Sequence, residues 1–404
     1  MSDIALPAHP VALHRLSLPA HLSGSSGTNR ALDRSILRAD DDLSALELFL
    51  AKYDKSPGTQ RLYRKECERL LLWAVYERKK PLSSLDAEDL AQYAMFLKDP
   101  RPRARWCGRR QDRDSDAWRP FEGPLGDSAY RTALSALSAF FKWACSVRYL
   151  NANPLVAVAR PRPWSQAQTK NRIQGRHWDE DMRAALSDAL QAMEFDESVS
   201  RAEKLRTRML LTFVMALAAR VGEIAHAQMG DFVSRHQSWW WTVLSKGQRI
   251  DEVPVPGAFV EQLMTYRQAL GLAPLPLAGE QIPLLTHLRV MEQAMRSVDS
   301  QAVLKSAPHL TERQLNRILK ELLLRASQLL ASRDPHKAQR LQRASMHWGR
   351  HTSITLQAEA GLESRYIQRN ARHRDPRTTA WYTHLEDNLW QAETQKLNKK
   401  LTTI

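Results

Sequence analysis

Apolar residues recur every three or four positions along most of this chain, which is the spacing of one face of an amphipathic helix. The clearest early stripe is formed by Tyr63, Cys67, Leu70, Leu71 and Ala74. Thr59, Asp86 and Ser128 can cap early helices. The same spacing predicts four long helices later in the chain, across 202–219, 257–271, 311–331 and 344–360. A mainly α fold follows.

One segment has the character of a β-hairpin. Residues 239–244 are aromatic and β-branched, Lys246-Gly247 can turn, and residues 250–255 return as a second strand. We therefore expect an N-terminal helical domain and a second, mixed but mostly helical domain that carries a small antiparallel β-sheet.

Proline-rich segments divide the chain. Asn153-Pro154 ends the first helical region, and Arg160-Pro-Arg-Pro-Trp164 favours an extended linker, because proline disfavours helix for itself and for its predecessor. The boundaries that we predict are a flexible leader at 1–40, a helical domain at 41–160, a linker at 161–176, a second domain at 177–385 and a tail at 386–404. The leader's arginines could contact DNA, or it could be a solvated tail without a role. The C-terminal tail could form an amphipathic helix that folds back on its own domain.

The charge of the chain points to a polyanionic partner. Lysine and arginine number 59 against 44 acidic residues, which gives a net charge of +15. Such a surplus suits nucleic acid better than an anionic membrane surface. No apolar run reaches the roughly 18 residues of a membrane span, and no secretory signal is visible. The three cysteines cannot form a disulfide framework or a four-cysteine zinc site. We expect a cytoplasmic protein that faces DNA.

An arginine-dense insert lies between the third and fourth predicted helices, with Trp106 and Trp118 among the arginines. Arginines interleaved with aromatic residues suit phosphate contact and base stacking. The alternative is a solvated loop with internal ion pairs. The arginines that we expect to bind DNA are Arg101, Arg103, Arg105, Arg109 and Arg110.

Two further arginines stand in unusual surroundings. A very apolar helix runs straight into Arg220, and a charge at the end of a buried helix must be paired or face a ligand. Glu223 could orient that guanidinium, although an ordinary ion pair at a helix end would look similar. On a helix, His347 and Arg350 share a face, so one phosphate could contact both.

Two other residues invite a chemical interpretation with less support. His347 and His351 have the spacing of a zinc-binding helix, but that motif needs glutamate after the first histidine, where Trp348 stands. We therefore expect no metal. Tyr382, beside a tryptophan, would in isolation be read as a core residue.

Taken in order, the pattern Arg-x-x-Glu, lysine in a hairpin turn, His-x-x-Arg, histidine and tyrosine resembles the tyrosine recombinase (phage integrase) family. The segment Thr378–His384 looks like the nucleophile signature of that family, and the resemblance covers about 40 to 385. The helical domain that ends at Asn153-Pro154 looks like the family's DNA core-binding domain. In the family the C-terminal tail docks on a neighbouring subunit, so the resemblance implies the same for the helix at 386–404. The catalytic set that the resemblance implies is Arg220, Lys246, His347, Arg350, His373 and Tyr382.

The resemblance also implies a role for each residue. Tyr382 would attack phosphorus and form a 3′-phosphotyrosyl link, while Lys246 would protonate the leaving 5′ oxygen. The two arginines would bind the scissile phosphate, His347 would assist proton transfer, and His373 would hydrogen-bond the phosphate. Glu223 would support Arg220 and His347 without contacting the phosphate itself. The expected protein is a site-specific recombinase that needs no cofactor, metal or ATP and works on double-stranded DNA as a homotetramer on paired sites.

Two positions depart from the family's pattern. The family often has glycine where Arg372 stands, and usually leucine where Gly349 stands; the second difference predicts looser helix packing at the site. A catalytically silent DNA-binding regulatory or architectural protein of the same fold is the main alternative, and a DNA-relaxing topoisomerase is another. Integration, excision, multimer resolution and transposition, and the need for an accessory recombinase or DNA-bending protein, stay open.

Overall fold

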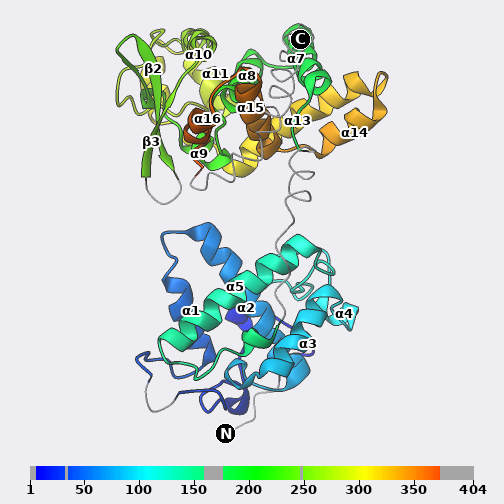
Figure 1. Cartoon of the computed structure of the whole chain (residues 1–404). Helices are drawn as coiled ribbons and strands as arrows, with labels where there is room; N and C mark the ends of the chain where they lie inside the picture. The colour runs from blue at the N-terminus through cyan, green and yellow to red at the C-terminus, as the bar shows by residue number, and fades with distance from the viewer. Residues whose placement is uncertain (1–5, 32–34, 159–175, 246–248, 374–404) are drawn as a thin grey trace, which may run out of the picture. The chain divides into compact units, whose positions relative to one another are not determined.

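The computed structural model describes residues 6–31, 35–158, 176–245 and 249–373, and most of them are helical (Figure 1). The chain divides into two units, Met1–Pro163 and Trp164–Ile404. None of the helices in the described ranges combines the length and the apolar character needed to cross a membrane.

The first unit is all helical, and its helices pack around one hydrophobic core. Its helices are α1 (Asp42–Ala51), α2 (Pro57–Trp73), α3 (Ala87–Lys98), α4 (Arg103–Trp106) and α5 (Asp127–Ser146), with 3-10 turns at Leu13–Arg15, Ala20–Leu22, Leu82–Ser84 and Pro154–Ala157 and a π-helical segment at Ala74–Arg78. The apolar stripe predicted on α2 is largely buried, with Cys67, Leu70 and Leu71 in the core. α2 and α5 pack against each other, and α1 contacts both.

The helix starts are only partly as predicted. Asp86 caps α3, since its side chain accepts a hydrogen bond from the backbone N–H of Asp89 at 2.9 Å. The proposed caps Thr59 and Ser128 are wrong. α2 begins at Pro57, whose fixed φ suits the first turn of a helix, and α5 begins one residue after Gly126.

Residues 6–31, which we expected to belong to a flexible leader, instead pack against the first unit. Leu13, Leu16 and Leu22 are buried in the same core as the helices. The backbone N–H of Leu13 donates to Glu68 Oε1 at 2.9 Å. The leader is therefore partly structural, because its leucines remove apolar surface of the bundle from water.

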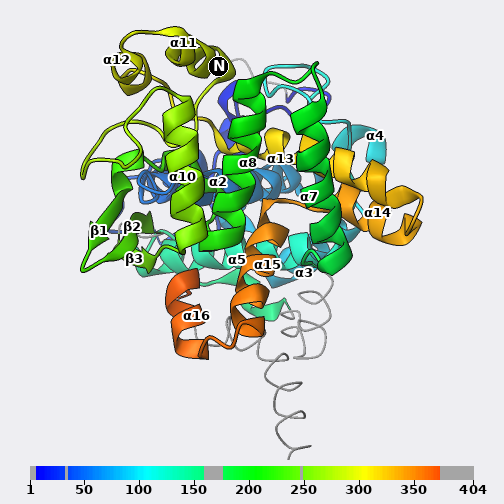
Figure 2. The same ribbon diagram turned by 90° about the horizontal axis from the view of Figure 1, so that it is seen from above.

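The second unit contains more elements and the sheet. Its helices are α7 (Glu180–Phe195), α8 (Arg201–Leu217), α9 (Val221–His226), α10 (Gly257–Ala269), α11 (Leu288–Arg296), α12 (Ser300–Lys305), α13 (Glu312–Ala331), α14 (Pro335–Arg343), α15 (Met346–Glu359) and α16 (Ser364–Ala371), with a 3-10 turn at Met229–Asp231. The helices α10, α8 and α7 lie side by side in Figure 2. All four long helices predicted from the sequence are present, to within two residues at each end.

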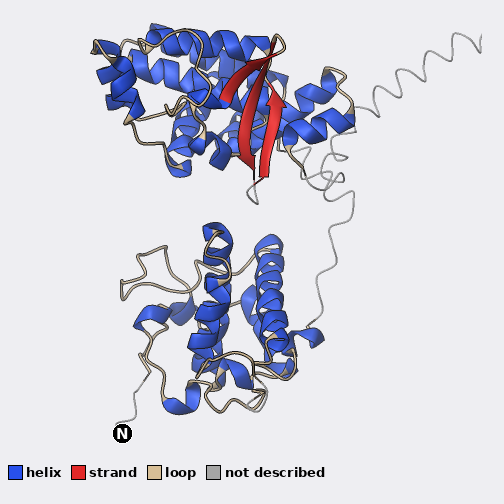
Figure 3. Cartoon of the chain, turned by 90° about the vertical axis from the view of Figure 1, so that its left-hand side faces the viewer, coloured by secondary structure: helices blue, strands red, loops and turns tan. Residues whose placement is uncertain are grey.

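A three-stranded antiparallel sheet packs beside α8, in the order β1 (Phe232–Arg235), β2 (Ser238–Ser245) and β3 (Arg249–Pro254) (Figure 3). The predicted hairpin corresponds to β2 and β3, and Trp241 pairs with Val253 in its register. The strand β1 was not predicted, because four residues are too few to show alternation. Phe213 of α8 packs edge-on against Trp241, with ring centroids 4.9 Å apart.

Gly349 allows α15 to lie very close to its neighbours. A Cβ atom at this position would stand 2.4 Å from Val214 Cγ1 and 2.6 Å from Trp178 Cη2. Both neighbouring side chains are fully buried. The prediction of looser packing is therefore wrong, since the missing side chain brings the helix closer to α8.

Substitution of Gly349 by alanine should therefore destabilise the protein. Overpacking a close-packed core costs about 1–3 kcal/mol, so we expect a loss of that order in the free energy of unfolding, measured by urea denaturation. Gly257→Ala is the matched control, because no atom lies within 4 Å of the Cβ that it would add. Equal stability of the two variants would contradict the close approach.

Candidate active site

The end of α8 positions the first arginine. Ala218 ends α8 in the left-handed region, with φ 45°, and Arg220 follows as the residue that precedes α9. Glu223 binds back to Arg220 twice: Oε2 accepts from the backbone N–H at 2.7 Å, and Oε1 accepts from Nη1 at 2.7 Å. The structure thus contains the predicted pair, with Arg220 partly exposed and Glu223 buried.

The second arginine, Arg350, lies on α15 and is only 3% exposed. Its Nη1 donates to the carbonyl of Ala218 at the end of α8, and its Nη2 donates to the carbonyl of Ala371 at the end of α16. The last carbonyls of a helix have no partner within the helix and carry its negative dipole end. Two helix ends therefore hold this guanidinium.

The two predicted phosphate-binding arginines meet at the same place. Arg220 Nη2 donates to the carbonyl of Arg372 at 3.0 Å and lies 3.5 Å from that of Ala371, which also accepts from Arg350. Residues 130 positions apart in sequence thus converge at the C-terminal end of α16.

A third guanidinium, for which no role was predicted from the sequence, belongs to the same cluster. Arg372 is 4% exposed, and its Nη2 donates to Glu223 Oε2 at 2.8 Å. The signals in the sequence were that Arg372 directly precedes a candidate catalytic histidine and stands where the family often has glycine. Burial could not be foreseen, because arginine is one of the least buried residue types.

Three histidines line the neighbourhood of the cluster. His347 and His351 lie one turn apart on α15, with ring centroids 4.2 Å apart, and His373 follows Arg372. Burial, together with nearby positive groups, lowers the pKa of His351 and of His373 to about 3. Partial removal from water and the charge of Arg350 also lower the pKa of His347. Neutral imidazoles at neutral pH can accept a proton or a hydrogen bond.

The balance of charge in the cluster favours an anion. Among the described residues, Glu223 is the carboxylate that pairs with two of the three guanidinium groups, those of Arg220 and Arg372, while Arg350 donates to backbone carbonyls. Burial and the charges of Arg220 and Arg372 lower the pKa of Arg350 to about 9. A buried surplus of positive charge is costly unless a negative group compensates it. Within the described ranges, no group of three or more His, Cys, Asp or Glu is placed to hold a metal ion.

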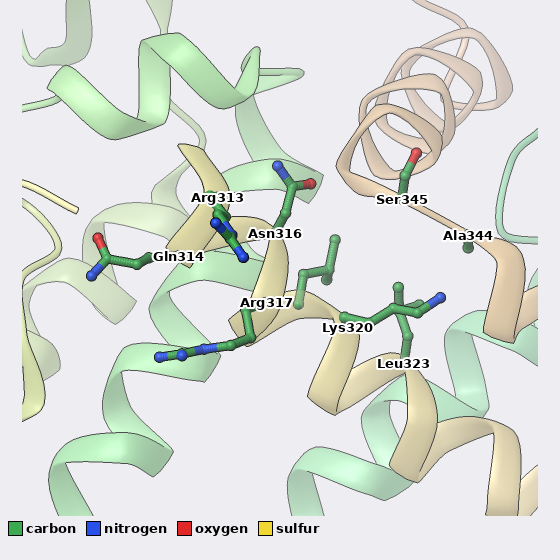
Figure 4. Close-up of a pocket in the computed structure, with 9 residues that line it drawn as sticks. Arg313, Gln314, Asn316, Arg317, Lys320, Leu323, Ala344 and Ser345 are labelled. Atoms are coloured by element: carbon green, nitrogen blue, oxygen red, sulfur yellow. The ribbon is translucent and has the colours of Figure 1, made fainter. Parts of the chain in front are cut away.

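A basic groove runs along α13 in the second unit (Figure 4). Its charged and polar lining comes from Arg313, Gln314, Asn316, Arg317, Lys320 and Ser345. Ser345 directly precedes α15, two residues before His347, and α13 also contacts α9. The groove therefore ends at the residue before the helix that carries His347 and Arg350, and none of its lining residues is acidic.

The arginine-dense insert is more internally paired than we expected. Arg101 and Arg103 pair with Asp99, at 2.7 and 3.4 Å, and Arg105 lies 3.4 Å from Glu77. Trp106 is fully buried and donates to Glu77 Oε1 at 2.8 Å, so it cannot stack on a base. Arg109 and Arg110 are exposed and stay the better candidates for phosphate contact.

Several predictions fall on parts of the chain that the structure does not describe. Lys246 and Tyr382 lie outside the described residues, as do the segment Thr378–His384, the tail from 386 and most of the linker. The strands β2 and β3 end and begin on either side of residues 246–248. The roles of Lys246 and Tyr382 therefore stay predictions.

The lowered histidine pKa values predict acid sensitivity. Histidines in the unfolded chain have a pKa near the ordinary value of about 6.5. As the pH falls, they therefore take up protons at a higher pH than His351 and His373 do in the folded protein. The stabilising contribution is complete above about pH 6.5 and is lost as the pH falls towards 3, at about 1–2 kcal/mol per histidine at pH 5. Urea unfolding at pH 7, 6 and 5 measures it. His351→Gln should flatten this dependence and the exposed His336→Gln should not; equal slopes would contradict the assignment.

Comparison with known proteins supports this description. The family model described as "Phage integrase family" matches residues 185–388. A search of curated proteins finds no match. Among solved structures, the chain is similar to the XerH site-specific recombinase bound to difH substrate in a pre-cleavage complex, with a TM-score of 0.52 and 13% identity over 89% of this chain and 86% of that one. The post-cleavage complex of XerH with palindromic difH gives 0.51 and 14% over 92% and 91%.

The family model covers half of the chain and includes the segments that supply all three arginines of the cluster. The structural likeness extends over both units at low identity, so it shows a common fold. The mostly helical architecture with a small antiparallel sheet agrees with the fold class expected from the sequence. The chain therefore belongs to the phage integrase family and has the fold of the tyrosine recombinases.

Proposed function

We propose that the protein is a site-specific DNA recombinase or integrase that cuts and rejoins double-stranded DNA through a 3′-phosphotyrosyl intermediate. The observation that carries this proposal is the convergence of Arg220 and Arg350 at the C-terminal end of α16. Glu223 is the carboxylate that pairs with Arg220 there. Arginine is always charged and its planar fork matches phosphate oxygens. A phosphate diester would supply the negative charge that the cluster lacks.

The two arginines would act on the phosphate. Each guanidinium has five N–H donors, so the carbonyls of Ala218 and Ala371 do not use all those of Arg350. The remaining donors can bind the non-bridging oxygens and stabilise the charge that develops as phosphorus becomes five-coordinate. Glu223 would keep Arg220 in the orientation that this contact needs.

The bond changes would involve residues of three segments. The phenolic oxygen of Tyr382 would bond to phosphorus as the bond to the 5′ oxygen breaks, and a neutral imidazole such as that of His347 would accept the phenolic proton. Lys246 would give a proton to the leaving 5′ oxygen, and His373 would hydrogen-bond the phosphate. The phosphotyrosyl link keeps the energy of the original diester, so a 5′ hydroxyl of another strand can reverse the step without ATP or a metal.

DNA binding has support beyond the cluster. The groove on α13 presents Arg313, Arg317 and Lys320, and the first unit exposes Arg109 and Arg110. Lysine and arginine supply the sequence-independent part of DNA affinity by displacing counterions. The XerH structures contain a bound substrate. We further propose that the protein works as a homotetramer on paired DNA sites, with or without an accessory protein. We also propose that it is located in the cytoplasm.

Trapping a covalent adduct tests the proposal directly. The protein would be incubated in EDTA with duplexes that tile the DNA flanking its gene, each with nicks at successive positions so that the cut strand diffuses away. A protein–DNA adduct that survives SDS is the expected result. Binding without any adduct would favour the silent DNA-binding protein, and relaxation of plasmids that lack such a site would favour the topoisomerase.

A further inference from the structure

We propose that Arg372 is a positioning residue that holds the phosphate-binding arginines in place by joining α16 to Glu223 and to the end of α8. This inference rests on the proposed function for its catalytic consequence. The residue lies in the second unit, between α16 and the candidate catalytic His373.

The contacts of Arg372 link three segments of the chain. Its Nε and Nη2 donate to the two carboxylate oxygens of Glu223, at 3.3 and 2.8 Å. Its Nη2 also donates to the carbonyl of Ala218 at 3.0 Å, and its Nη1 donates to that of Asn370 at 2.6 Å. The guanidinium lies 5.1 Å from the centre of the Trp241 ring on β2, within the range of a cation–π contact.

These partners are also the partners of the catalytic arginines. Glu223 binds Arg220, and the carbonyl of Ala218 accepts from Arg350. The backbone carbonyl of Arg372 itself accepts from Arg220 at 3.0 Å. Arg372 therefore fixes the carboxylate and the helix end that in turn orient both arginines.

Its backbone conformation indicates that the side chain is needed there. Arg372 has φ 53° and ψ 43°, the left-handed region in which a residue with a Cβ is less stable than glycine by about 1–2 kcal/mol. Glycine would relieve that cost, so a buried arginine in this conformation implies that its guanidinium contacts offset it. All five N–H donors of Arg372 have protein partners, the fifth being the carbonyl of Leu217 at 3.5 Å, so none is left for DNA and the residue must act through its neighbours.

Removal of the guanidinium should change catalysis more than DNA affinity. With Arg372→Gly the backbone is relaxed, but Glu223 and the carbonyl of Ala218 each lose a donor. We expect adduct formation at saturating DNA to slow by about tenfold, with the dissociation constant for DNA within about twofold of wild type. The charge of Arg372 lowers the pKa of Glu223, so the variant should also lose activity at a higher pH on the acid side.

The experiment compares full-length wild type, Arg372→Gly, Arg372→Lys and a matched control. The control is Arg267→Lys, because Arg267 is also about 2% exposed and pairs with Glu280 at 2.8 Å in the same unit but away from the cluster. Cleavage rate, its pH profile and DNA affinity are measured with the adduct assay. Hydrogen exchange of α9 and α16 is measured by mass spectrometry without DNA.

The expected result is a slower rate and a shifted acid limb for Arg372→Gly, partial rescue by Arg372→Lys, and faster exchange in α9 and α16; Arg267→Lys should change none of these. An unchanged rate and pH profile for Arg372→Gly would overturn the inference. If wild type forms no adduct, the proposed function fails. Hydrogen exchange of α9 in Arg372→Gly and in wild type then still shows whether Arg372 stabilises that helix. Should Arg372→Gly not fold, Arg372→Lys against Arg267→Lys makes the same comparison.

Discussion

Replacement of Tyr382 by phenylalanine should abolish the covalent protein–DNA adduct. The change removes only the phenolic oxygen, which we propose as the nucleophile, so no bond to phosphorus can form. Adduct formation should fall at least about a thousandfold, to the limit of detection, because no other group replaces the missing atom. The adduct assay on nicked duplexes measures this loss.

The controls for Tyr382→Phe separate chemistry from binding. Tyr366 lies on α16, is 45% exposed and is not part of the guanidinium cluster, so Tyr366→Phe should form the adduct at the wild-type rate. The affinity of Tyr382→Phe for the same duplex should stay within about twofold of wild type, since the arginines that bind phosphate are intact. An adduct formed by Tyr382→Phe would show that another residue is the nucleophile.

The parts of this protein that depend on local pattern could be predicted from its sequence. The long helices have apolar stripes over many turns, and β2 is aromatic and β-branched and is followed by the turn-favouring dipeptide Lys246-Gly247, so both were recognisable. The pairing of Arg220 with Glu223 also follows from a local spacing. These features are encoded within about twenty residues of the chain.

The features that escaped prediction depend on partners distant in sequence. Leu13 and Leu16 lie in a segment without helical periodicity, and they are buried only because the helices of the first unit pack against them. Gly349 suggested looseness, but Val214 and Trp178 approach it closely. Trp106 resembled a residue that stacks on bases, but it is buried and donates to Glu77, which lies 29 residues earlier in the chain.

Arg372 shows the same limit at the site itself. Its left-handed backbone and its burial against Trp241 result from how α16 meets the sheet. No spacing rule relates it to Glu223, which lies far earlier in the chain. The sequence thus predicts which groups carry the chemistry, and the fold shows which side chains contact the predicted arginines.

Substitution of Arg350 by methionine should remove activity while leaving the fold intact. Methionine keeps much of the side-chain volume but has no donors for the non-bridging oxygens. Loss of one donor to a developing oxyanion costs about 10²–10³ in rate, and Arg350 would supply more than one, so we expect a fall of at least about a thousandfold in adduct formation. The rate at saturating DNA measures the effect.

The stability of the same variant should be close to that of wild type. Burial and the neighbouring charges of Arg220 and Arg372 disfavour the charge of Arg350, as its pKa of about 9 indicates. Removing that charge offsets the loss of its hydrogen bonds to the carbonyls of Ala218 and Ala371. We expect a free energy of unfolding within about 1 kcal/mol of wild type, because replacing a buried charge by an apolar group is often neutral.

The two measurements together distinguish a catalytic arginine from a structural one. Arg365→Met is the control, because Arg365 lies exposed on α16 and pairs with Glu363, so it should change neither rate nor stability. Arg350→Lys keeps the charge without the planar fork and should fall between wild type and Arg350→Met in rate. A strongly destabilised Arg350→Met that still cleaves DNA at the wild-type rate would mean that Arg350 serves the fold and that another group holds the phosphate.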